Sequence, residues 1–269
     1  MIATDRELTV GDVRLRYRDE GAGSALVLIH GWTLDLEMWE PQARELCGSM
    51  RVIRYDRRGF GLSSGRPAPS EDVGDLLALC NHLGLRSVVL VGMSQGARVA
   101  AHAAAGHPGL ISCVVFDGAP PGTVFENAMF ESDIPIDRYR ELTRVGGARA
   151  FREAWRHHPV TQLQTRDASC QELLQRILER YRAEDLTDPD PRGSLPPQEA
   201  SAIRAPALVI SGALETDSRL AAADALARAL PSSQRAIIPA AGHLANLDNP
   251  GVYNSLLRRF SGTLSRRKS

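Results

Sequence analysis

The chain has no excess of charge of either sign and no long hydrophobic run. Lys and Arg together number 32, and Asp and Glu together also number 32, so the net charge is zero. A balanced chain gives no electrostatic reason to expect binding to nucleic acid or to an anionic membrane. The one cationic run, Arg266-Arg267-Lys268, is short and terminal, and we interpret it as a solubilising end. No apolar run approaches bilayer-spanning length, and the charged N-terminus predicts no signal peptide.

Cysteine is sparse, and no two cysteines have the C-x-x-C spacing. Cys47, Cys80, Cys113 and Cys170 are dispersed along the chain. This pattern predicts buried free thiols, which are typical of a reducing compartment, so we expect a cytoplasmic protein. Metal-ligand spacings such as H-E-x-x-H are also missing, and we expect neither a metal ion nor another cofactor.

The pattern that is present is that of an α/β protein. With 269 residues, 43% hydrophobic and 24% charged, the chain can form one globular domain of enzyme size with an insertion. Short apolar runs alternate with helical patterns, which predicts a doubly wound, mostly parallel eight-stranded sheet with flanking helices. We predict a hairpin around 9–15, strands near 25–29, 52–55, 88–91, 114–116, 208–210 and 236–238, and helices near 38–46, 73–83, 97–107 and 252–260.

The alternation stops between residues 120 and 197, where only helical patterns occur. Ser169-Cys170-Gln171-Glu172 has the form of a capping box. Residues 187–197 are rich in Asp, Pro and Gly and are interpreted as a linker. We therefore predict a core of 1–119 and 198–269 with a helical cap inserted at 120–197, and a separate helical domain is the alternative. The apolar stripe of this segment consists of Leu173, Leu174, Ile177, Leu178 and Tyr181.

The most informative motif is Gly92-Met93-Ser94-Gln95-Gly96, which lies between a predicted strand and a predicted helix. Strand, G-x-S-x-G and helix form the context of a nucleophile elbow, in which the chain reverses within a few residues. Ser94 is then held in a strained backbone conformation with its hydroxyl above the sheet. Gly92 and Gly96 fit because a Cβ would collide where the strand and the helix nearly touch. The motif alone is weak in a chain with 23 Gly, and its context makes Ser94 the candidate nucleophile.

A serine hydroxyl needs a base to become a nucleophile, and His243 is the candidate. It lies in Ala240-Ala241-Gly242-His243-Leu244, after the last predicted strand and before the last predicted helix. The remaining histidines compete poorly, because they fall on helices or in the cap, where a base is not held in place. They are His82, His102 and His107 on helices, and His157 and His158 in the cap.

An oxyanion hole needs two N–H groups that converge on one oxygen atom. His30-Gly31-Trp32 follows the strand at 25–29. We expect the backbone N–H groups of Trp32 and Gln95 to form this hole. The imidazole of His30 is expected to shape the loop through hydrogen bonds, and the side chain of Gln95 is expected to take no part.

Four motifs together resemble the α/β-hydrolase superfamily, in particular its cap-bearing branch of small esterases and lactonases. They are His30-Gly31-Trp32, Asp56-Arg57-Arg58-Gly59-Phe60-Gly61-Leu62-Ser63, the Ser94 elbow, and Gly242-His243-Leu244-Ala245-Asn246-Leu247-Asp248-Asn249-Pro250. The last motif is similar to G-H-x-x-N-L-x-x-P of 3-oxoadipate enol-lactone hydrolases. The resemblance covers nearly the whole chain. It also implies a structural role for the second motif, in which Asp56 and Arg58 satisfy nearby backbone groups.

The sequence departs from the family pattern at two places. Ala97 replaces a second glycine after the elbow, which a helix tolerates. The family's G-x-x-D is here Gly212-Ala213-Leu214-Glu215, so the acid position holds Glu, and a carboxylate of either length can orient a histidine. Asp217 and Asp117 are the alternative acids, although Asp217 or Ser218 also suits the N-terminal cap of the next helix.

The resemblance implies a metal-free serine hydrolase that uses Ser94, His243 and Glu215 on a small-molecule ester or lactone. Trp32 and Trp155 are expected to wall its pocket, with plain core packing as the alternative. The same motifs allow C–C hydrolysis, lyase or perhydrolase chemistry, or a ligand-binding protein with little catalysis. Six arginines of the cap are candidates for binding a substrate carboxylate, unless they pair with neighbouring Asp137, Glu141 and Glu153: Arg138, Arg140, Arg144, Arg149, Arg152 and Arg156.

Overall fold

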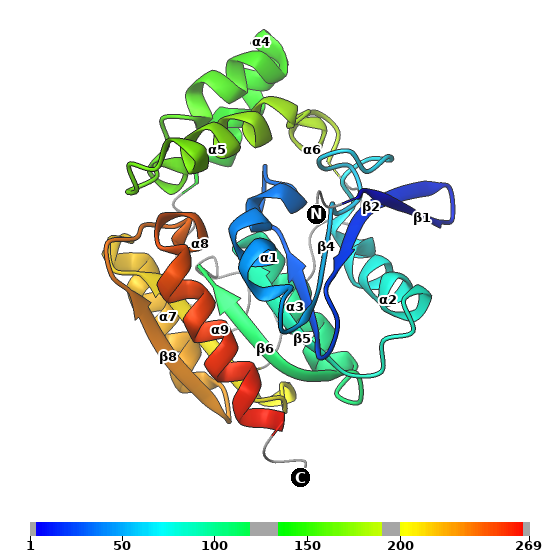
Figure 1. Cartoon of the computed structure of the whole chain (residues 1–269). Coiled ribbons are helices and arrows are strands. Elements are labelled where there is room, and N and C mark those ends of the chain that lie inside the picture. The colour runs from blue at the N-terminus through cyan, green and yellow to red at the C-terminus, as the bar shows by residue number, and fades with distance from the viewer. Residues whose placement is uncertain (1–3, 119–133, 190–199, 266–269) are drawn as a thin grey trace.

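The computed structural model describes residues 4–118, 134–189 and 200–265 (Figure 1). Its centre is an eight-stranded sheet in the order β1-β2-β4-β3-β5-β6-β7-β8. The pairs β1–β2 and β2–β4 are antiparallel and every other pair is parallel, which confirms the predicted mostly parallel sheet. The strands are β1 (Arg6–Val10), β2 (Val13–Glu20), β3 (Ala25–Ile29), β4 (Arg51–Tyr55), β5 (Val88–Met93), β6 (Ile111–Asp117), β7 (Ala207–Gly212) and β8 (Ser233–Ile238).

Helices cover both faces of the sheet, as a doubly wound fold requires. Successive side chains of a strand point to opposite faces. Leu26 and Leu28 of β3 pack in the apolar cluster that includes α1 and α9, whereas Val27 and Ile29 pack in the cluster that includes α2, α3 and α7. The helices of this part of the fold are α1 (Glu40–Leu46), α2 (Asp72–His82), α3 (Gln95–Gly106), α7 (Asp217–Ala229), α8 (Ala245–Asp248) and α9 (Pro250–Ser265).

Three further helices, α4 (Ile136–Trp155), α5 (Ala168–Arg180) and α6 (Glu184–Thr187), follow β6 and precede β7 in the chain. They lie together over one end of the sheet, at the top of Figure 1. The backbone of α4 breaks at Gly147, whose φ is 67°. The predicted stripe of α5 is buried in the same apolar cluster as one face of the sheet. Residues 120–133 and 190–197 of the predicted cap and linker lie outside the described residues, as does the cationic run at 266–268.

The start of α5 differs from the predicted capping box. The N-cap is Asp167, and its Oδ1 accepts hydrogen bonds from the backbone N–H of Ser169 at 2.9 Å and from its hydroxyl at 2.7 Å. Ser169 is therefore inside the first turn rather than before it. The capping-box interpretation was wrong by two residues because the Asp167 carboxylate, a charged acceptor, satisfies the first N–H groups.

The four cysteines form no disulfide. Cys80, Cys113 and Cys170 are buried as predicted, while Cys47 is only half-buried at the end of α1. No helix within the described ranges is long and apolar enough to cross a membrane.

Candidate active site

Ser94 lies at the sharp turn between β5 and α3. Its φ of 50° and ψ of −117° are strained for a residue with a side chain. A Cβ on Gly92 would lie 2.4 Å from the carbonyl oxygen of Gly96. A Cβ on Gly96 would lie 2.5 Å from the carbonyl oxygen of Ile29 in β3. Strand, turn and helix therefore approach as closely as a nucleophile elbow requires, and only glycine fits at positions 92 and 96.

The loop after β3 packs directly on this elbow. A Cβ on Gly31 would lie 2.7 Å from Sδ of Met93 and 3.2 Å from Cβ of Ser94. This contact places the backbone of the neighbouring Trp32 close to Ser94. Gln95 is the first residue of α3, and a first-turn N–H has no acceptor within its own helix. Trp32 lines the same pocket as Ser94, and Gln95 directly follows Ser94 in the chain.

His30 is fully buried and holds the loop in place. Its Nδ1 lies 2.8 Å from the carbonyl oxygen of Gly31, and its Nε2 accepts the backbone N–H of Arg57 at 2.9 Å. Burial, reinforced by the positive charge of Arg57, lowers the pKa of His30 well below its usual range. The ring is therefore neutral, and each of its nitrogens has a hydrogen-bond partner, as expected for a side chain that shapes the loop.

The loop of residues 56–63 only partly follows expectation. Asp56 accepts the backbone N–H groups of Leu36 at 2.7 Å and Leu62 at 2.8 Å, as predicted. Arg58 instead forms a two-pronged ion pair with the carboxylate of Asp75 on α2, at 2.6 and 2.5 Å. The prediction for Arg58 was wrong because a carboxylate is a stronger partner for its planar guanidinium than a carbonyl.

The side chain of Gln95 also has a partner that the sequence did not indicate. Its Oε1 accepts a hydrogen bond from Nη2 of Arg57 at 2.5 Å, and Nη1 of Arg57 pairs with Asp72 at 2.8 Å. Arg57 is fully buried, so this network anchors the first residue of α3 from below. This contact gives the Gln95 side chain a structural role, and that only its N–H serves the oxyanion hole stays a prediction.

His243 and Glu215 are in contact. Nδ1 of His243 lies 2.8 Å from Oε2 of Glu215, and the two side chains are only 5% and 4% exposed. The loop carrying His243 is held against β7, because a Cβ on Gly212 would lie 2.2 Å from the carbonyl oxygens of Ala241 and Gly242. On the other side, a Cβ on Gly118 would lie 2.9 Å from Cε1 of His243. Backbone on two sides thus fixes the imidazole.

Neither of the alternative acids, Asp117 and Asp217, bonds to His243 among the described contacts. Asp117 ends β6, is fully buried, and accepts a hydrogen bond from the hydroxyl of Tyr253 at 3.0 Å. Burial raises its pKa to about 8, with a further contribution from the charge of Glu215. Asp217 is exposed as the first residue of α7. Thr216, rather than Asp217 or Ser218, is the N-cap of α7 and makes no side-chain cap bond, so that expectation was wrong.

The sequence reasoning missed Arg219, which is buried on α7 with Nη1 3.4 Å from Nδ1 of His243. No local pattern indicates this contact, because Glu215 lies in the turn before α7 and does not share a helical face with Arg219.

Ser94 and His243 line one pocket. In the described part of the chain it encloses about 20 Å³, room for about one water molecule, and Trp155 at the end of α4 and the turn at 160–161 contribute to its lining. Trp155 packs edge-on against Trp32 with 4.9 Å between ring centres. Both rings also pack in the surrounding apolar cluster, so the same two side chains line the pocket and contribute to the core. The pocket is lined by Trp32, Thr33, Leu34, Met93, Ser94, Ile134, Trp155, Val160, Thr161, His243 and Leu244.

Polar side chains tie the α4–α6 segment to the loop after β3. Nε1 of Trp155 donates to Oγ1 of Thr33 at 2.9 Å, and Nε1 of Trp32 donates to Asp185 of α6 at 2.6 Å. The guanidinium of Arg180 on α5 donates to Oδ2 of Asp35 at 2.9 and 2.7 Å. These contacts join residues more than a hundred positions apart, and no local pattern indicates them.

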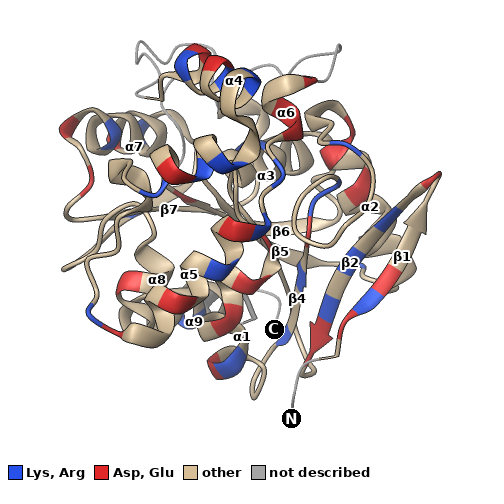
Figure 2. Ribbon diagram, turned by 90° about the horizontal axis from the view of Figure 1, so that it is seen from above, with Lys and Arg blue, Asp and Glu red and all other residues tan. Residues whose placement is uncertain are grey.

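Most of the candidate cap arginines are exposed on α4, where charges of both signs alternate (Figure 2). Arg140 pairs with Asp137 at 3.0 Å, and Arg144 pairs with Glu141 at 2.7 Å. The self-paired surface that was the alternative interpretation therefore holds for these two residues. Within the described ranges, no group of three or more His, Cys, Asp or Glu residues is arranged to hold a metal ion.

Residues 24–250 match the family model described as the alpha/beta hydrolase fold, so the chain belongs to this family. A Bacillus subtilis (strain 168) protein is 29% identical over 94% of this chain and 97% of its own length. Its name assigns it, provisionally, as a 2-succinyl-6-hydroxy-2,4-cyclohexadiene-1-carboxylate synthase.

Solved structures agree with this assignment. An esterase from Thermogutta terrifontis has a TM-score of 0.81 at 27% identity, over 97% of this chain and 99% of the esterase. The enol-lactonase from Burkholderia xenovorans LB400 has a TM-score of 0.78 at 25% identity, over 96% and 100% of the two chains. The resemblance inferred from the four motifs is thereby confirmed: the fold is that of an α/β hydrolase, with esterases and an enol-lactonase among its structural neighbours.

Proposed function

We propose that this α/β hydrolase is a serine hydrolase that cleaves a small-molecule carboxylic ester or lactone. The observation that supports it most is the buried 2.8 Å contact between Nδ1 of His243 and Oε2 of Glu215, at the edge of a pocket that Ser94 also lines. When Nδ1–H is donated to Glu215, Nε2 is left as the basic nitrogen. Ser94 is the nucleophile, His243 the base and Glu215 the residue that orients the base.

The reaction proceeds in two steps, the acylation of Ser94 and the hydrolysis of the acyl-enzyme. Oγ of Ser94 attacks the carbonyl carbon while its proton passes to Nε2 of His243, and the oxyanion accepts hydrogen bonds from the backbone N–H groups of Trp32 and Gln95. The ester C–O bond breaks as His243 gives the proton to the leaving oxygen, which in a lactone remains tethered. Water then loses a proton to His243 and adds to the acyl carbon, which releases the acid and restores Ser94. Glu215 stabilises the imidazolium in both steps.

We further propose the domain division predicted above, with residues 120–197 as a cap on the core of 1–119 and 198–269. The placement of Trp155, Val160 and Thr161 in the Ser94 pocket supports it. Trp32 and Trp155 then form the apolar wall against the substrate. The free cysteines support a reducing, cytoplasmic environment, and we propose no partner beyond the small-molecule substrate and no cofactor.

A fluorophosphonate probe tests the proposal, because it reacts with an activated serine. We expect covalent labelling of the wild type at Ser94 by mass spectrometry and none in Ser94→Ala. The same preparations are then assayed with p-nitrophenyl acetate and butyrate and with a panel of lactones. Labelling together with turnover supports the hydrolase. A protein that binds ligands but shows neither labelling nor turnover would be a ligand-binding member of the family.

A second candidate is other cofactor-free chemistry on the same residues, such as lyase, C–C hydrolase or perhydrolase chemistry. The observation that favours it is the full-length similarity to a relative named as a synthase. Labelling of Ser94 without turnover of any ester or lactone is the result that would favour this candidate.

A further inference from the structure

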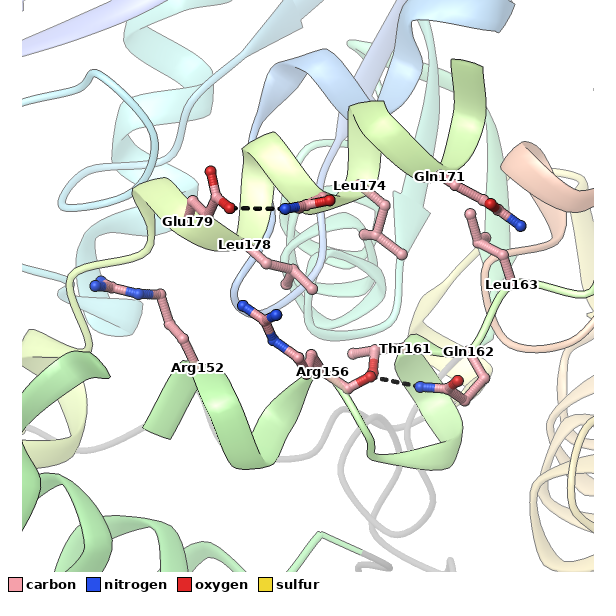
Figure 3. Close-up of a pocket in the computed structure, with 10 residues that line it drawn as sticks. Arg152, Arg156, Thr161, Gln162, Leu163, Gln171, Leu174, Leu178 and Glu179 are labelled. Carbon is pink, nitrogen blue, oxygen red and sulfur yellow. Dashed lines mark hydrogen bonds between the residues drawn. The ribbon is translucent and has the colours of Figure 1, made fainter. Parts of the chain in front are cut away.

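A second pocket lies in the cap, between the C-terminal part of α4 and α5 (Figure 3). It has a volume of about 260 Å³ and opens to the protein surface. Two helices and the turn at 161–163 surround it, and every lining residue belongs to the described part of the chain. Neither Ser94 nor His243 lines it, so the pocket is distinct from the candidate active site.

One side of the pocket is apolar. Leu174 and Leu178 stand one turn apart on α5 and are 5% and 8% exposed, and Leu163 closes the far end. Figure 3 shows the three side chains directed into the space between the helices. This side offers a surface for a short hydrocarbon chain.

The opposite side is cationic. Arg152 and Arg156 project from successive turns of α4, and the carboxylate that lines the pocket is that of Glu179. Arg152 donates to the carbonyl oxygen of Tyr181 at 2.8 Å, a neutral partner that leaves its charge uncompensated. Arg156 contacts Glu153 at 3.4 Å in an exposed pair, which is worth little in water. Among the lining residues there are two guanidinium groups and one carboxylate, so the lining itself carries a net positive charge.

Hydrogen bonds between lining residues hold the remaining walls in place. The amide of Gln162 donates to the carbonyl oxygen of Arg156 at 2.5 Å, and that of Gln175 donates to Glu179 at 3.0 Å. Glu179 is thus partly satisfied by Gln175 rather than by either arginine. The guanidinium of Arg156 lies near the centre of the pocket in Figure 3, where a ligand carboxylate can replace its exposed contact with Glu153.

A thin wall separates the two pockets. Thr161 lines both of them, and its hydroxyl donates to the carbonyl oxygens of Trp155 and His158 at 2.8 Å each. Trp155 lines the Ser94 pocket, while its neighbour Arg156 lines the cap pocket. A molecule in the cap pocket is therefore separated from the Ser94 pocket by the end of α4 and its following turn.

We propose that the cap pocket binds a small organic anion with an apolar body, of the size of a medium-chain carboxylate. The carboxylate pairs with Arg156 and Arg152, and the hydrocarbon part lies on Leu163, Leu174 and Leu178. The anion is a molecule separate from the substrate, because the end of α4 and its following turn lie between the cap pocket and the Ser94 pocket. The binding site therefore does not rest on the proposed function.

Binding is measured with hexanoate on the full-length Ser94→Ala protein by titration calorimetry, with hexanol and hexylamine as the neutral and cationic analogues. We expect hexanoate to bind and the two analogues to bind at least tenfold more weakly. Arg156→Gln is expected to weaken hexanoate about tenfold, and Glu179→Gln to strengthen it about threefold. Arg144→Gln, an exposed arginine of the same helix, is the matched control and leaves affinity unchanged.

The proposal is overturned if hexanoate does not bind, if hexanol binds as well as hexanoate, or if Arg156→Gln binds like the control. Thermal unfolding of each variant checks that it is folded, and Arg152→Gln provides an independent removal of charge. Because the protein carries Ser94→Ala, these outcomes do not depend on whether the chain is a hydrolase.

The separation of the anion from the substrate is tested with the active protein. Arg156→Gln should affect kcat/KM equally for a p-nitrophenyl monoester of adipate and for p-nitrophenyl butyrate, and added hexanoate should not compete with either ester. A loss of about tenfold confined to the charged ester, together with competition by hexanoate, would show that the charged end of the substrate enters the cap pocket and would overturn the proposal of a separate anion.

Discussion

The two regions around Ser94 are held together in different ways. At the end of the sheet, backbone packs against backbone: the positions of Gly92, Gly96 and Gly212 leave no room for even a methyl group. The cap meets the core through side chains instead, such as Arg180 on Asp35 and Trp155 on Thr33. Main-chain contacts are insensitive to side-chain identity except at glycine, whereas each of these two contacts of the proposed cap depends on two particular residues.

This difference suggests a division of labour. The core presents the proposed nucleophile, base and oxyanion donors on a rigid main-chain frame, which is what preorganised catalysis requires. The cap is attached by separable polar contacts, and the Ser94 pocket beneath it encloses only about 20 Å³. A substrate therefore needs the cap or its side chains to move. Substitutions in the core should act on chemistry, and those in the cap should act on stability, closure and binding.

The largest expected effect is that of Ser94→Ala. It removes the proposed nucleophile and should lower esterase kcat by on the order of a million-fold, the scale seen when a triad serine is removed. The melting temperature should change by only a few degrees, because one oxygen atom is lost. Ser255→Ala, on the exposed face of α9, is the control and should keep full activity. Turnover above trace level in Ser94→Ala would show that another group is the nucleophile.

The second largest loss of kcat is expected for Glu215→Gln. The amide carries no negative charge to stabilise the imidazolium, and its NH2 group can donate to Nδ1 and hold the wrong tautomer, so we expect kcat to fall about ten-thousand-fold. Asp217→Asn and Asp117→Asn should each change kcat less than tenfold, because neither carboxylate bonds to His243 among the described contacts. Steady-state kinetics of the three variants tests this. A steep loss in Asp117→Asn with little loss in Glu215→Gln would move the acid to β6.

Arg180→Gln tests the attachment of the cap. Asp35 is only 1% exposed, and burial raises its pKa although Arg180 acts in the opposite direction. Removal of Arg180 leaves this carboxylate without its main cationic partner. Because the Arg180 side chain is itself partly exposed, we expect a loss of about 2 kcal/mol in the free energy of unfolding, below the range for fully buried pairs. Urea denaturation measures it.

The control for this experiment is Arg144→Gln, which removes an exposed pair on the same cap and should cost less than about 0.5 kcal/mol. Equal losses in the two variants would mean that the Arg180–Asp35 contact does not fasten the cap more strongly than a surface ion pair.

The last prediction concerns Asp117 and the pH dependence of stability. In the unfolded chain this carboxyl ionises near its ordinary pKa of 3.8, whereas in the native protein burial raises the pKa to about 8. Between these values the native state binds one more proton, so the free energy of unfolding falls as the pH rises. Asp117→Asn removes this contribution.

The difference in the free energy of unfolding between the wild type and Asp117→Asn is measured by urea denaturation at pH 5, 6, 7 and 8. The stability of Asp117→Asn relative to the wild type should increase steadily across this range. The buried Asp56, whose pKa is raised to about 7, contributes with the same sign but is present in both proteins and cancels. A constant difference between the two proteins would show that Asp117 is already ionised at pH 5.

Local features of the sequence determined much of this protein. Continuous apolar runs predicted the buried strands, and the contacts at Gly92 and Gly96 follow from the requirement for a tight turn between β5 and α3. The hairpin was also predictable, since Val10 pairs with Val13 across a Gly11–Asp12 turn. Periodicity and turn chemistry act over a few residues, so they can be read without knowledge of the fold.

Only the tertiary structure decided which carboxylate meets His243 and what the cap touches. Glu215 and Asp117 both follow strands, and it is the approach of the β7 turn to the His243 loop that brings Glu215 within 2.8 Å of the ring. Arg58 turned to Asp75 rather than to backbone for a similar reason, because packing of α2 supplied a stronger acceptor. Such contacts join residues that are distant in the chain. Their partners depend on how helices and loops pack in three dimensions, and no short-range pattern encodes that arrangement.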